Sequence, residues 1–388
     1  MCRKHLFDVA LVASAIVTGV VAWSGQPLAL PLSMAFPMIW SLTRNRLMAG
    51  AVSAAYFLAA SRGLPQGVAA YYGADLLPGF LLWLTASSGF VAIHALFWTA
   101  RSGVRRASRY GAIMLLMAVP PFGILGWAHP LTAAGIVFPA WGWTGLVAMA
   151  AGLVAMTTRL RLVASVTMTG LWLWSAINWT TFDRPTAWQG VDLSLGSSLG
   201  RKFDPARHYL LVREAKAAGR SDRDVVILPE SAIGFWNPTV ERLWVRALRG
   251  SGLRVLAGAT AIDERGYNNV LVEISADGGR IAYRQRMPVP GSMWQPWLVL
   301  TGEIGGAQAH FFANPITEVA GSRAAILICY ELLIVWPIIQ SMLYDPAEIV
   351  AVGNGWWTRG TTIVAIQRAN AVAWSRLFAK PLVLSFNM

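Results

Sequence analysis

The sequence predicts an N-terminal multi-span α-helical membrane domain over residues 1–181, followed by an α/β domain over residues 182–388. The distribution of charged residues supports this division. Residues 1–180 hold eleven lysines and arginines but only two acids, Asp8 and Asp75. The rest of the chain holds 21 bases and 17 acids, a balance typical of a soluble domain. Long uncharged stretches fill the first half, and short β-branched runs alternate with helical patterns in the second.

Seven uncharged stretches of the first half are candidate membrane spans, because a helical span needs about 20 mainly apolar residues. They are Val9–Trp23, Leu28–Leu42, Leu47–Ser61, Leu76–Ala100, Tyr110–Trp127, Leu131–Thr158 and Leu162–Thr181. The third stretch is short, and a re-entrant segment is the alternative there. A buried soluble bundle is the alternative for the whole half, but the basic loops between the stretches argue against it.

Basic residues in short loops predict the orientation, since cytoplasmic loops are enriched in lysine and arginine. Bases precede the first stretch and follow the second, fourth and sixth: Arg3, Lys4, Arg44, Arg46, Arg101, Arg105, Arg106, Arg109, Arg159 and Arg161. The alternate loops carry only Arg62. We therefore expect a multi-pass protein with a cytoplasmic N-terminus and the second domain on the outer side. The net charge of +13 then reflects membrane orientation, and direct nucleic-acid binding is not expected.

The second half predicts alternating strands and helices. A helix is expected from Asp204, a suitable N-cap followed by Pro205, to Gly219. Strands are expected in DVVILPE, LRVLAGA, RAAILICYE, AEIVAVGNGWW and KPLVLSF, a hairpin turn at Asp277-Gly278-Gly279, and helices in LLIVWPIIQSML and TTIVAIQRANAVAWSRLF.

Glu230 and Cys329 each come just after a strand-like run. The carboxyl ends of strands form the ligand crevice of many α/β sheets, where a carboxylate and a thiol could serve as general base and nucleophile. A cysteine in an apolar strand is more often a small core residue. Cys2 is expected on the cytoplasmic side and Cys329 on the other, so a disulfide within one chain is not expected. The five histidines show no metal spacing, and neither a metal nor another cofactor is expected.

Five pieces of the second half, in this order, resemble the nitrilase (carbon–nitrogen hydrolase) superfamily: VVILPESAIG, YNNVLVEISADGGRIAYRQRMPVPG, AAILICYE, VAVGNGWW and RANAVAWSRLFAKPLVLSFN. The similarity is greatest to apolipoprotein N-acyltransferases, which carry this domain outside the membrane behind several spans. As a whole the chain resembles a family of conjugal transfer proteins encoded on bacterial plasmids. The resemblance implies an α-β-β-α sandwich on the periplasmic side of the inner membrane, short at its C-terminus, where the family continues through further strands.

The superfamily uses a glutamate, a lysine and a cysteine, and the resemblance assigns these roles residue by residue. Glu230 in LPES matches the general base and Cys329 in ICYE matches the nucleophile. Gln285 stands at the position of the lysine, and it lacks the positive charge. Further pocket candidates are Arg286, Glu331, Asn354 and Trp356.

The resemblance implies amide hydrolysis or N-acyl transfer through a cysteine thioester, in a membrane protein of plasmid conjugation. Gln285 favours an alternative, a catalytically inactive scaffold or binding protein that assists the conjugation machinery. The expected partners are the lipid bilayer and lipid, lipoprotein or conjugation-apparatus proteins.

Overall fold

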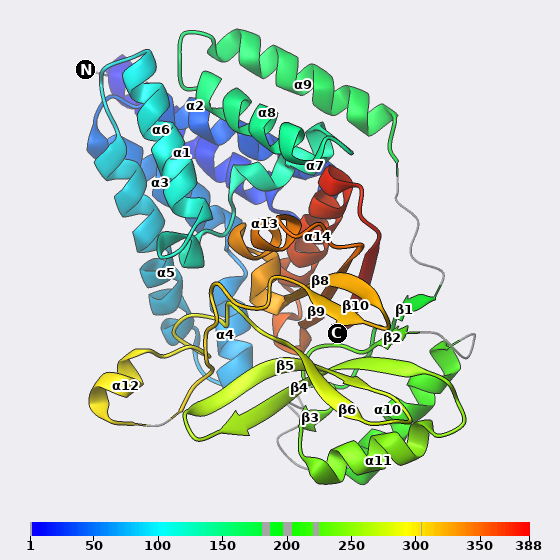
Figure 1. The fold of residues 1–388 in the computed structure, drawn as a ribbon. Coiled ribbons are helices and arrows are strands. Elements are labelled where there is room, and N and C mark those ends of the chain that lie inside the picture. The colour runs from blue at the N-terminus through cyan, green and yellow to red at the C-terminus, as the bar shows by residue number, and fades with distance from the viewer. Residues whose placement is uncertain (1, 181–186, 197–203, 220–224, 304) are drawn as a thin grey trace. The chain divides into compact units, whose positions relative to one another are not determined.

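The computed structural model describes the chain except for residues 1, 181–186, 197–203, 220–224 and 304. The chain forms two compact units, and each is described here by itself (Figure 1). The first unit comprises Met1–Phe182, Leu333–Trp336 and Gly360–Ala379, and the second comprises Asp183–Leu332, Pro337–Arg359 and Lys380–Met388. The first unit thus takes in a helix from the second half of the sequence.

The described part of the first unit is helical. Its α-helices are α1 (Cys2–Ala22), α2 (Ala35–Ser41), α3 (Arg46–Ala60), α4 (Leu64–Tyr72), α5 (Leu76–Phe97), α6 (Val104–Ala118), α7 (Ala134–Val137), α8 (Gly142–Ala155), α9 (Arg161–Ile177) and α14 (Ile363–Phe378). Its 3₁₀ helices are η1 (Pro27–Met34), η2 (Phe122–Leu125) and η3 (Pro130–Ala133).

Several expected spans are not single helices. Leu28–Leu42 is divided between η1 and α2, and Leu131–Thr158 between η3, α7 and α8. The stretch from Tyr110 ends its helix at Ala118, before two consecutive prolines that cannot continue the hydrogen-bond ladder. The described residues hold two helices long and apolar enough to cross a membrane, Lys4–Ala22 and Leu76–Phe97, or three if one bent pair is a single span.

That bent pair is α3 and α4, whose axes differ by 50°. It contains the short third stretch, Leu47–Ser61, for which a re-entrant segment was the alternative. An angle of this size fits either a broken span or a re-entrant loop. The expectation of seven spans is therefore not confirmed by helix length.

The second unit contains a 6-stranded and a 4-stranded sheet. The first follows the order β1 (Trp188–Gly190), β2 (Val225–Ile227), β4 (Arg254–Asp263), β5 (Gly266–Ile274) and β6 (Gly279–Arg284), with β3 (Gly234–Phe235) paired to β4. The second follows β10 (Leu382–Asn387), β9 (Glu348–Asn354), β8 (Ser322–Ile328) and β7 (Thr317–Val319). The helices are α10 (Pro205–Ala218), α11 (Pro238–Leu248), α12 (Trp297–Thr301), η4 (Cys329–Leu332), α13 (Trp336–Met342) and η5 (Trp356–Thr358).

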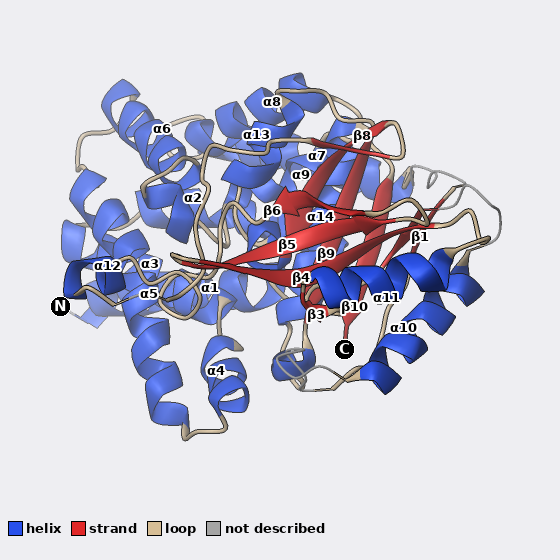
Figure 2. Ribbon diagram, turned by 60° about the horizontal axis from the view of Figure 1, so that its bottom comes forward, coloured by secondary structure: helices blue, strands red, loops and turns tan. Residues whose placement is uncertain are grey.

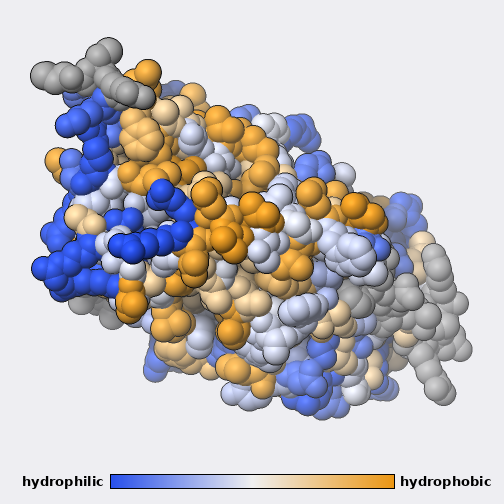
Figure 3. Space-filling view, turned by 90° about the horizontal axis from the view of Figure 1, so that it is seen from above, coloured by the Kyte–Doolittle hydropathy of each residue, from blue (hydrophilic) through white to orange (hydrophobic). Residues whose placement is uncertain are grey.

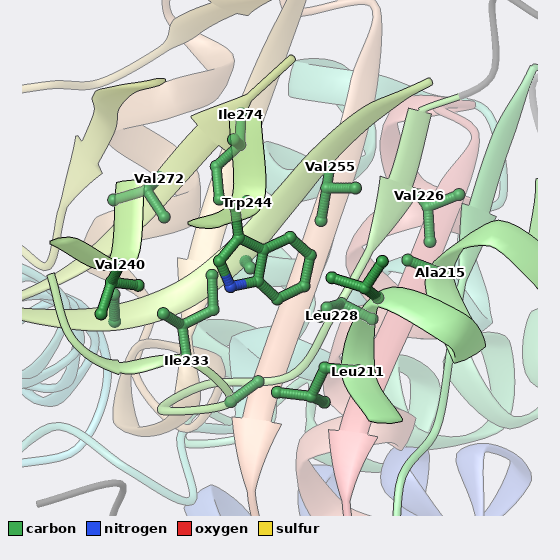
Figure 4. Packing of buried hydrophobic residues seen from close by; sticks show 14 of the residues in the cluster. Leu211, Ala215, Val226, Leu228, Ile233, Val240, Trp244, Val255, Val272 and Ile274 are labelled. Carbon is green, nitrogen blue, oxygen red and sulfur yellow. The ribbon is translucent and has the colours of Figure 1, made fainter. Parts of the chain in front are cut away.

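Strand alternation produces two apolar layers. Val226 and Leu228 face α10 and α11, where Trp244 fills the centre of the layer (Figure 4). Val225 and Ile227 point to the other face, where they pack with residues of the second sheet such as Ile326, Ile328 and Val350. Since successive strand residues point to opposite faces, one run of apolar residues supplies both cores. Figure 2 shows α10 and α11 as the helical layer on the first sheet.

Local signals are confirmed at several elements. Asp204 caps α10 by accepting hydrogen bonds from the amides of Ala206 (3.0 Å) and Arg207 (3.4 Å). The turn at Asp277-Gly278-Gly279 joins antiparallel β5 and β6. The expected helix from Leu332 begins only at Trp336, with Pro337 in its first turn; Leu332 itself ends η4, and residues 333–335 form a turn and a bend.

The edge of the second sheet at β10 is covered by another part of the same unit. The amide of Leu193 donates to the Phe386 carbonyl (2.9 Å), and the amide of Met388 donates to the Leu193 carbonyl (2.7 Å). This edge of the sheet is therefore paired in the structure, which satisfies backbone groups that an edge strand would otherwise expose.

Candidate functional site

The ends of several strands meet at the candidate site. Cys329 follows β8, and Asn354 and Asn387 end the parallel strands β9 and β10, where they are register partners. Glu230 follows β2 after a short turn, and Gln285 follows β6 directly. All of these side chains belong to the second unit, so its two sheets bring together the residues that the sequence suggested.

Glu230 and Cys329 are hydrogen-bonded neighbours, and their exposed fractions are 5% and 6%. Burial raises the pKa of Glu230 to about 7, while hydrogen bonds from Asn269, Cys329 and the Asn354 backbone lower it, and the charge of Glu331 raises it. Cys329 forms no disulfide. A carboxylate with a pKa near neutrality can accept a proton from a thiol, and the sulfur can then attack a carbonyl or nitrile carbon.

The backbone at both residues is constrained. Cys329 has φ 51° and Ser231, next to Glu230, has φ 58°, in the left-handed region that side chains other than glycine rarely adopt. The turn at Glu230 lies directly on Gly258 of β4, where an added Cβ would come within 2.5 Å of the Pro229 carbonyl oxygen. Such conformations persist only where surrounding contacts enforce them, and they often mark functional sites.

Gln285 lies in the site but reaches Glu230 through another residue. The Nδ2 of Asn269 donates to Oε1 of Glu230 (2.7 Å) and to Oε1 of Gln285 (2.9 Å). The Nε2 of Gln285 donates to the carbonyl of Ile328, the residue before Cys329 (3.0 Å). The side-chain amides of two residues therefore link the Glu230 carboxylate to β8, the strand before Cys329, and the residue at the expected lysine position, Gln285, carries no charge.

Sequence reasoning missed Asn269. Its signal was an asparagine pair, YNNV, at the start of a strand in which the other residues are mostly apolar. A buried asparagine in a strand needs hydrogen-bond partners, so its presence there indicates a polar contact within the fold. The exposed fraction of Asn269 is 4%.

Arg286 and Glu331 belong to a second hydrogen-bond network, which is centred on Tyr283. Neither side chain is exposed. Arg286 donates through Nε to Tyr283 (2.9 Å), through Nη1 to Gln340 (2.9 Å) and through Nη2 to Ser341 (3.0 Å). The described hydrogen bonds of the Arg286 guanidinium thus go to Tyr283, Gln340 and Ser341, and those of the Gln285 side chain go to Asn269 and Ile328.

Glu331 ties two chain segments together. Its Oε1 accepts from the backbone amides of Arg286 (2.7 Å) and Met287 (3.1 Å), and its Oε2 accepts from the amide of Ile328 (2.8 Å). Burial raises the pKa of Glu331, and Arg286 with these hydrogen bonds opposes the rise. The carboxylate thus fixes the residues beside Gln285 and Cys329.

The other pocket candidates lie at the end of β9 and just after it. Asn354 is buried, its backbone hydrogen-bonds with Glu230, and its Oδ1 accepts from Nδ2 of Asn387 (2.8 Å). Trp356 lies in η5, two residues further, and is half-buried. Within the described ranges, no group of three or more histidine, cysteine, aspartate or glutamate side chains could hold a metal ion.

Comparison with known proteins agrees with this geometry. A family model described as carbon–nitrogen hydrolase matches residues 58–376, so the match begins inside the first unit. The chain is 61% identical over 387 residues to a "probable conjugal transfer protein TraB" of Sinorhizobium fredii, covering 100% of both chains. It is 55% identical to a conjugal transfer protein TraB of Agrobacterium fabrum, covering 97% of this chain and 92% of that one.

A solved structure gives a partial match. A CN-hydrolase superfamily protein from Xanthomonas campestris aligns with 51% of this chain and 73% of its own, at 13% identity and a TM-score of 0.31. The family model, by contrast, covers most of the sequence and includes the residues from Glu230 to Asn354. The chain belongs to the carbon–nitrogen hydrolase family.

Proposed function

We propose that this chain is a membrane protein of plasmid conjugal transfer whose second unit forms an acyl thioester at Cys329, in amide hydrolysis or N-acyl transfer. The observation that carries the chemistry is the buried Glu230–Cys329 pair at the strand ends. The role in conjugation is supported by full-length similarity to the TraB proteins of two bacteria.

The proposed reaction has two steps. The sulfur of Cys329 attacks the carbonyl carbon of an amide or ester, and Glu230 takes the thiol proton. The tetrahedral intermediate collapses, the bond to the leaving amine or alcohol breaks, and the leaving group takes the proton from Glu230. Water or an acceptor amine then attacks the thioester, loses a proton through Glu230, and leaves the acid or amide product and the Cys329 thiol.

Gln285 is the specific observation that favours a second candidate, a binding scaffold. Its Nε2 already donates to the Ile328 carbonyl, and an amide stabilises an oxyanion less than an ammonium does in a dry site. On this alternative the second unit binds a lipid, lipoprotein or conjugation-apparatus protein without reacting with it.

An acyl probe separates the two candidates. Detergent-solubilised full-length protein is incubated with the p-nitrophenyl ester of an alkyne-bearing fatty acid, and label is measured before and after neutral hydroxylamine, which cleaves thioesters. The enzyme proposal expects a labile label that is absent in Cys329→Ala and slower by about 100-fold or more in Glu230→Gln. If the wild-type protein takes up no label although its thermal melting shows that it is folded, the scaffold is favoured.

We further propose an inner-membrane location with about seven spans, a cytoplasmic N-terminus and a periplasmic second unit. Hydrogen bonds between predicted loops support this arrangement. Arg44 donates through Nε to Asp8 (2.9 Å), and Arg106 donates through Nη1 to the Ser41 carbonyl (2.9 Å). These contacts join the segment before the first predicted span to the segments after the second and fourth, which supports a shared side for these basic segments.

Hydrogen bonds also connect residues toward the predicted outer side. Trp23, at the end of the first predicted span, donates through Nε1 to the hydroxyl of Tyr56 in the third span (2.8 Å), and this hydroxyl donates to the carbonyl of Ala128 in the loop after the fifth (3.0 Å). Large apolar side chains remain exposed on α1, α5 and α9, including Val17 (60%) and Ile177 (82%). Figure 3 shows hydrophobic residues spread over the middle of the viewed face, with hydrophilic residues toward its margins. Such a surface is suited to lipid.

A further inference from the structure

Asn269 connects the two sheets of the second unit at the candidate site. It lies in β5 of the first sheet, and Ile328 ends β8 of the second. Asn269 donates to Glu230 and to Gln285, and Gln285 donates to the Ile328 carbonyl. The amide of Gln285 also donates to the Asn269 carbonyl (2.8 Å), which fixes the two residues relative to each other.

The direction of these hydrogen bonds is determined by their two ends. A backbone carbonyl and an ionised carboxylate can only accept. The NH₂ group of Gln285 must therefore face Ile328, its oxygen must face Asn269, and the NH₂ group of Asn269 must face both Gln285 and Glu230. Hydrogen bonds in such a chain polarise one another, and this chain ends on the carboxylate.

We infer that Asn269 is a positioning residue: with Gln285 it forms an amide bridge that holds Glu230 at a fixed place relative to Cys329 and favours its ionised form. The inference rests on the proposed function, because it gives Glu230 the role of base. It also accounts for how the site keeps Glu230 hydrogen-bonded without a lysine. The charged or titratable neighbours that act on Glu230 are Cys329 and Glu331.

The next residue in the strand provides a matched control. Asn268 is buried to a similar degree, 5% against 4% exposed for Asn269, but its side chain points to the opposite face of the sheet. It donates to Asp263 (2.9 Å) and contacts Nε2 of His310 (2.6 Å). An aspartate at residue 268 therefore adds the same charge to the same strand without touching the amide bridge.

The test is the pH dependence of Cys329 alkylation by iodoacetamide in the full-length protein, with Cys2→Ser as the background. Asn269→Asp replaces a donor by a second carboxylate beside Glu230, so the midpoint of the rate profile is expected to rise by about one pH unit or more. Asn268→Asp is expected to leave the midpoint unchanged. Gln285→Lys, added to Asn269→Asp, supplies an ammonium beside the new carboxylate and is expected to restore a lower midpoint.

Thermal unfolding gives a second readout that does not depend on thiol reactivity. Asn269→Asp is expected to melt close to wild type at pH 5, where one carboxylate is protonated, and well below it at pH 8. Equal shifts in Asn269→Asp and Asn268→Asp, or an unchanged midpoint and melting profile in Asn269→Asp, would overturn the inference. If the acyl probe fails to label Cys329 while these shifts occur, the bridge stands and the proposed acyl chemistry fails.

Discussion

Arg286 and Glu331 form an ion pair, Nε to Oε1 3.9 Å, in which neither side chain is exposed to solvent. The pair connects the segment that carries Gln285 to the segment that carries Cys329. The Tyr283 hydroxyl forms hydrogen bonds with both partners. A buried ion pair is not in itself evidence of high stability, because both charges lose their hydration. Here each charged group also has hydrogen-bond partners. Removing one member of the ion pair therefore leaves the other as a buried charge without its counter-ion.

Arg286→Met should therefore destabilise the second unit by about 3–5 kcal/mol, the usual cost of leaving a buried charge without its partner. Arg286→Lys should also be harmful, since an ammonium cannot reach Tyr283, Gln340 and Ser341 together. Chemical denaturation of the solubilised protein measures the loss. The double variant Arg286→Met/Glu331→Gln should lose less than the sum of the single variants, and additive losses would show that the pair is not coupled.

Asp204→Ala should lower the free energy of unfolding by about 1 kcal/mol, because it removes the N-cap of α10. Asp204→Asn serves as the control, since an asparagine oxygen can accept the same hydrogen bonds from Ala206 and Arg207. An equal loss in both variants would indicate that the charge, and not the cap, matters. The measurement is the denaturation midpoint of full-length protein.

The pH dependence of stability should contain a contribution from Glu230. Its pKa in the folded protein, about 7, lies above its ordinary value of 4.5. The folded state therefore binds a proton more tightly than the unfolded state, and this stability is complete below pH 4.5 and lost as the pH rises to 7. Glu230→Gln does not titrate, so at pH 8 it should be more stable than wild type by up to about 3 kcal/mol.

Melting temperatures of wild type and Glu230→Gln at pH 5 and pH 8 check this expectation. The advantage of the variant should be clear at pH 8 and small at pH 5. Parallel pH profiles for the two proteins would mean that Glu230 titrates near its ordinary value.

Local patterns were sufficient to predict much of the second unit. The α10 cap depends on neighbouring residues alone, and the β5–β6 turn is specified by Asp277-Gly278-Gly279. Cys329 and Glu230 were predicted as site residues because each follows a strand-like run and matches a family motif, and the structure places them next to each other. Such signals lie within a few residues of one another, so a short stretch of sequence contains all the residues that determine the local structure.

Contacts between distant residues could not be predicted in this way. Asn269 and Glu230 are separated by 39 positions, and Arg286 and Glu331 by 45. Helix continuity in the first unit was also overestimated, since an apolar window counts residues and ignores breaks such as that between η1 and α2. The packing of α14 in the first unit depends on close contacts such as that of Gly135 with the backbone of Ala373.

Membrane orientation can be checked with reporter proteins fused at positions in the predicted loops. Alkaline phosphatase, active only in the periplasm, should be inactive after Arg46, Arg109 and Arg161 and active after Arg201, which lies outside the described residues. Green fluorescent protein at the same positions should give the reverse pattern and so controls for expression. Phosphatase activity after Arg46 together with none after Arg201 would contradict the proposed orientation.

Gly258→Ala should disturb the site without changing any polar group. An added methyl at this β4 residue would meet the backbone of Glu230, Ser231 and the Pro229 carbonyl oxygen, and backbone cannot rotate away as a flexible side chain can. The turn must therefore shift, which moves the Glu230 carboxylate away from Cys329. Acyl-probe labelling should fall by about 100-fold, the range expected when a general base is misplaced.

Gly170→Ala is the matched control, because nothing lies within 4 Å of the added methyl in α9 and alanine favours a helix. Labelling that survives in Gly258→Ala, in protein that melts as a folded species, would mean that Glu230 does not need its present position.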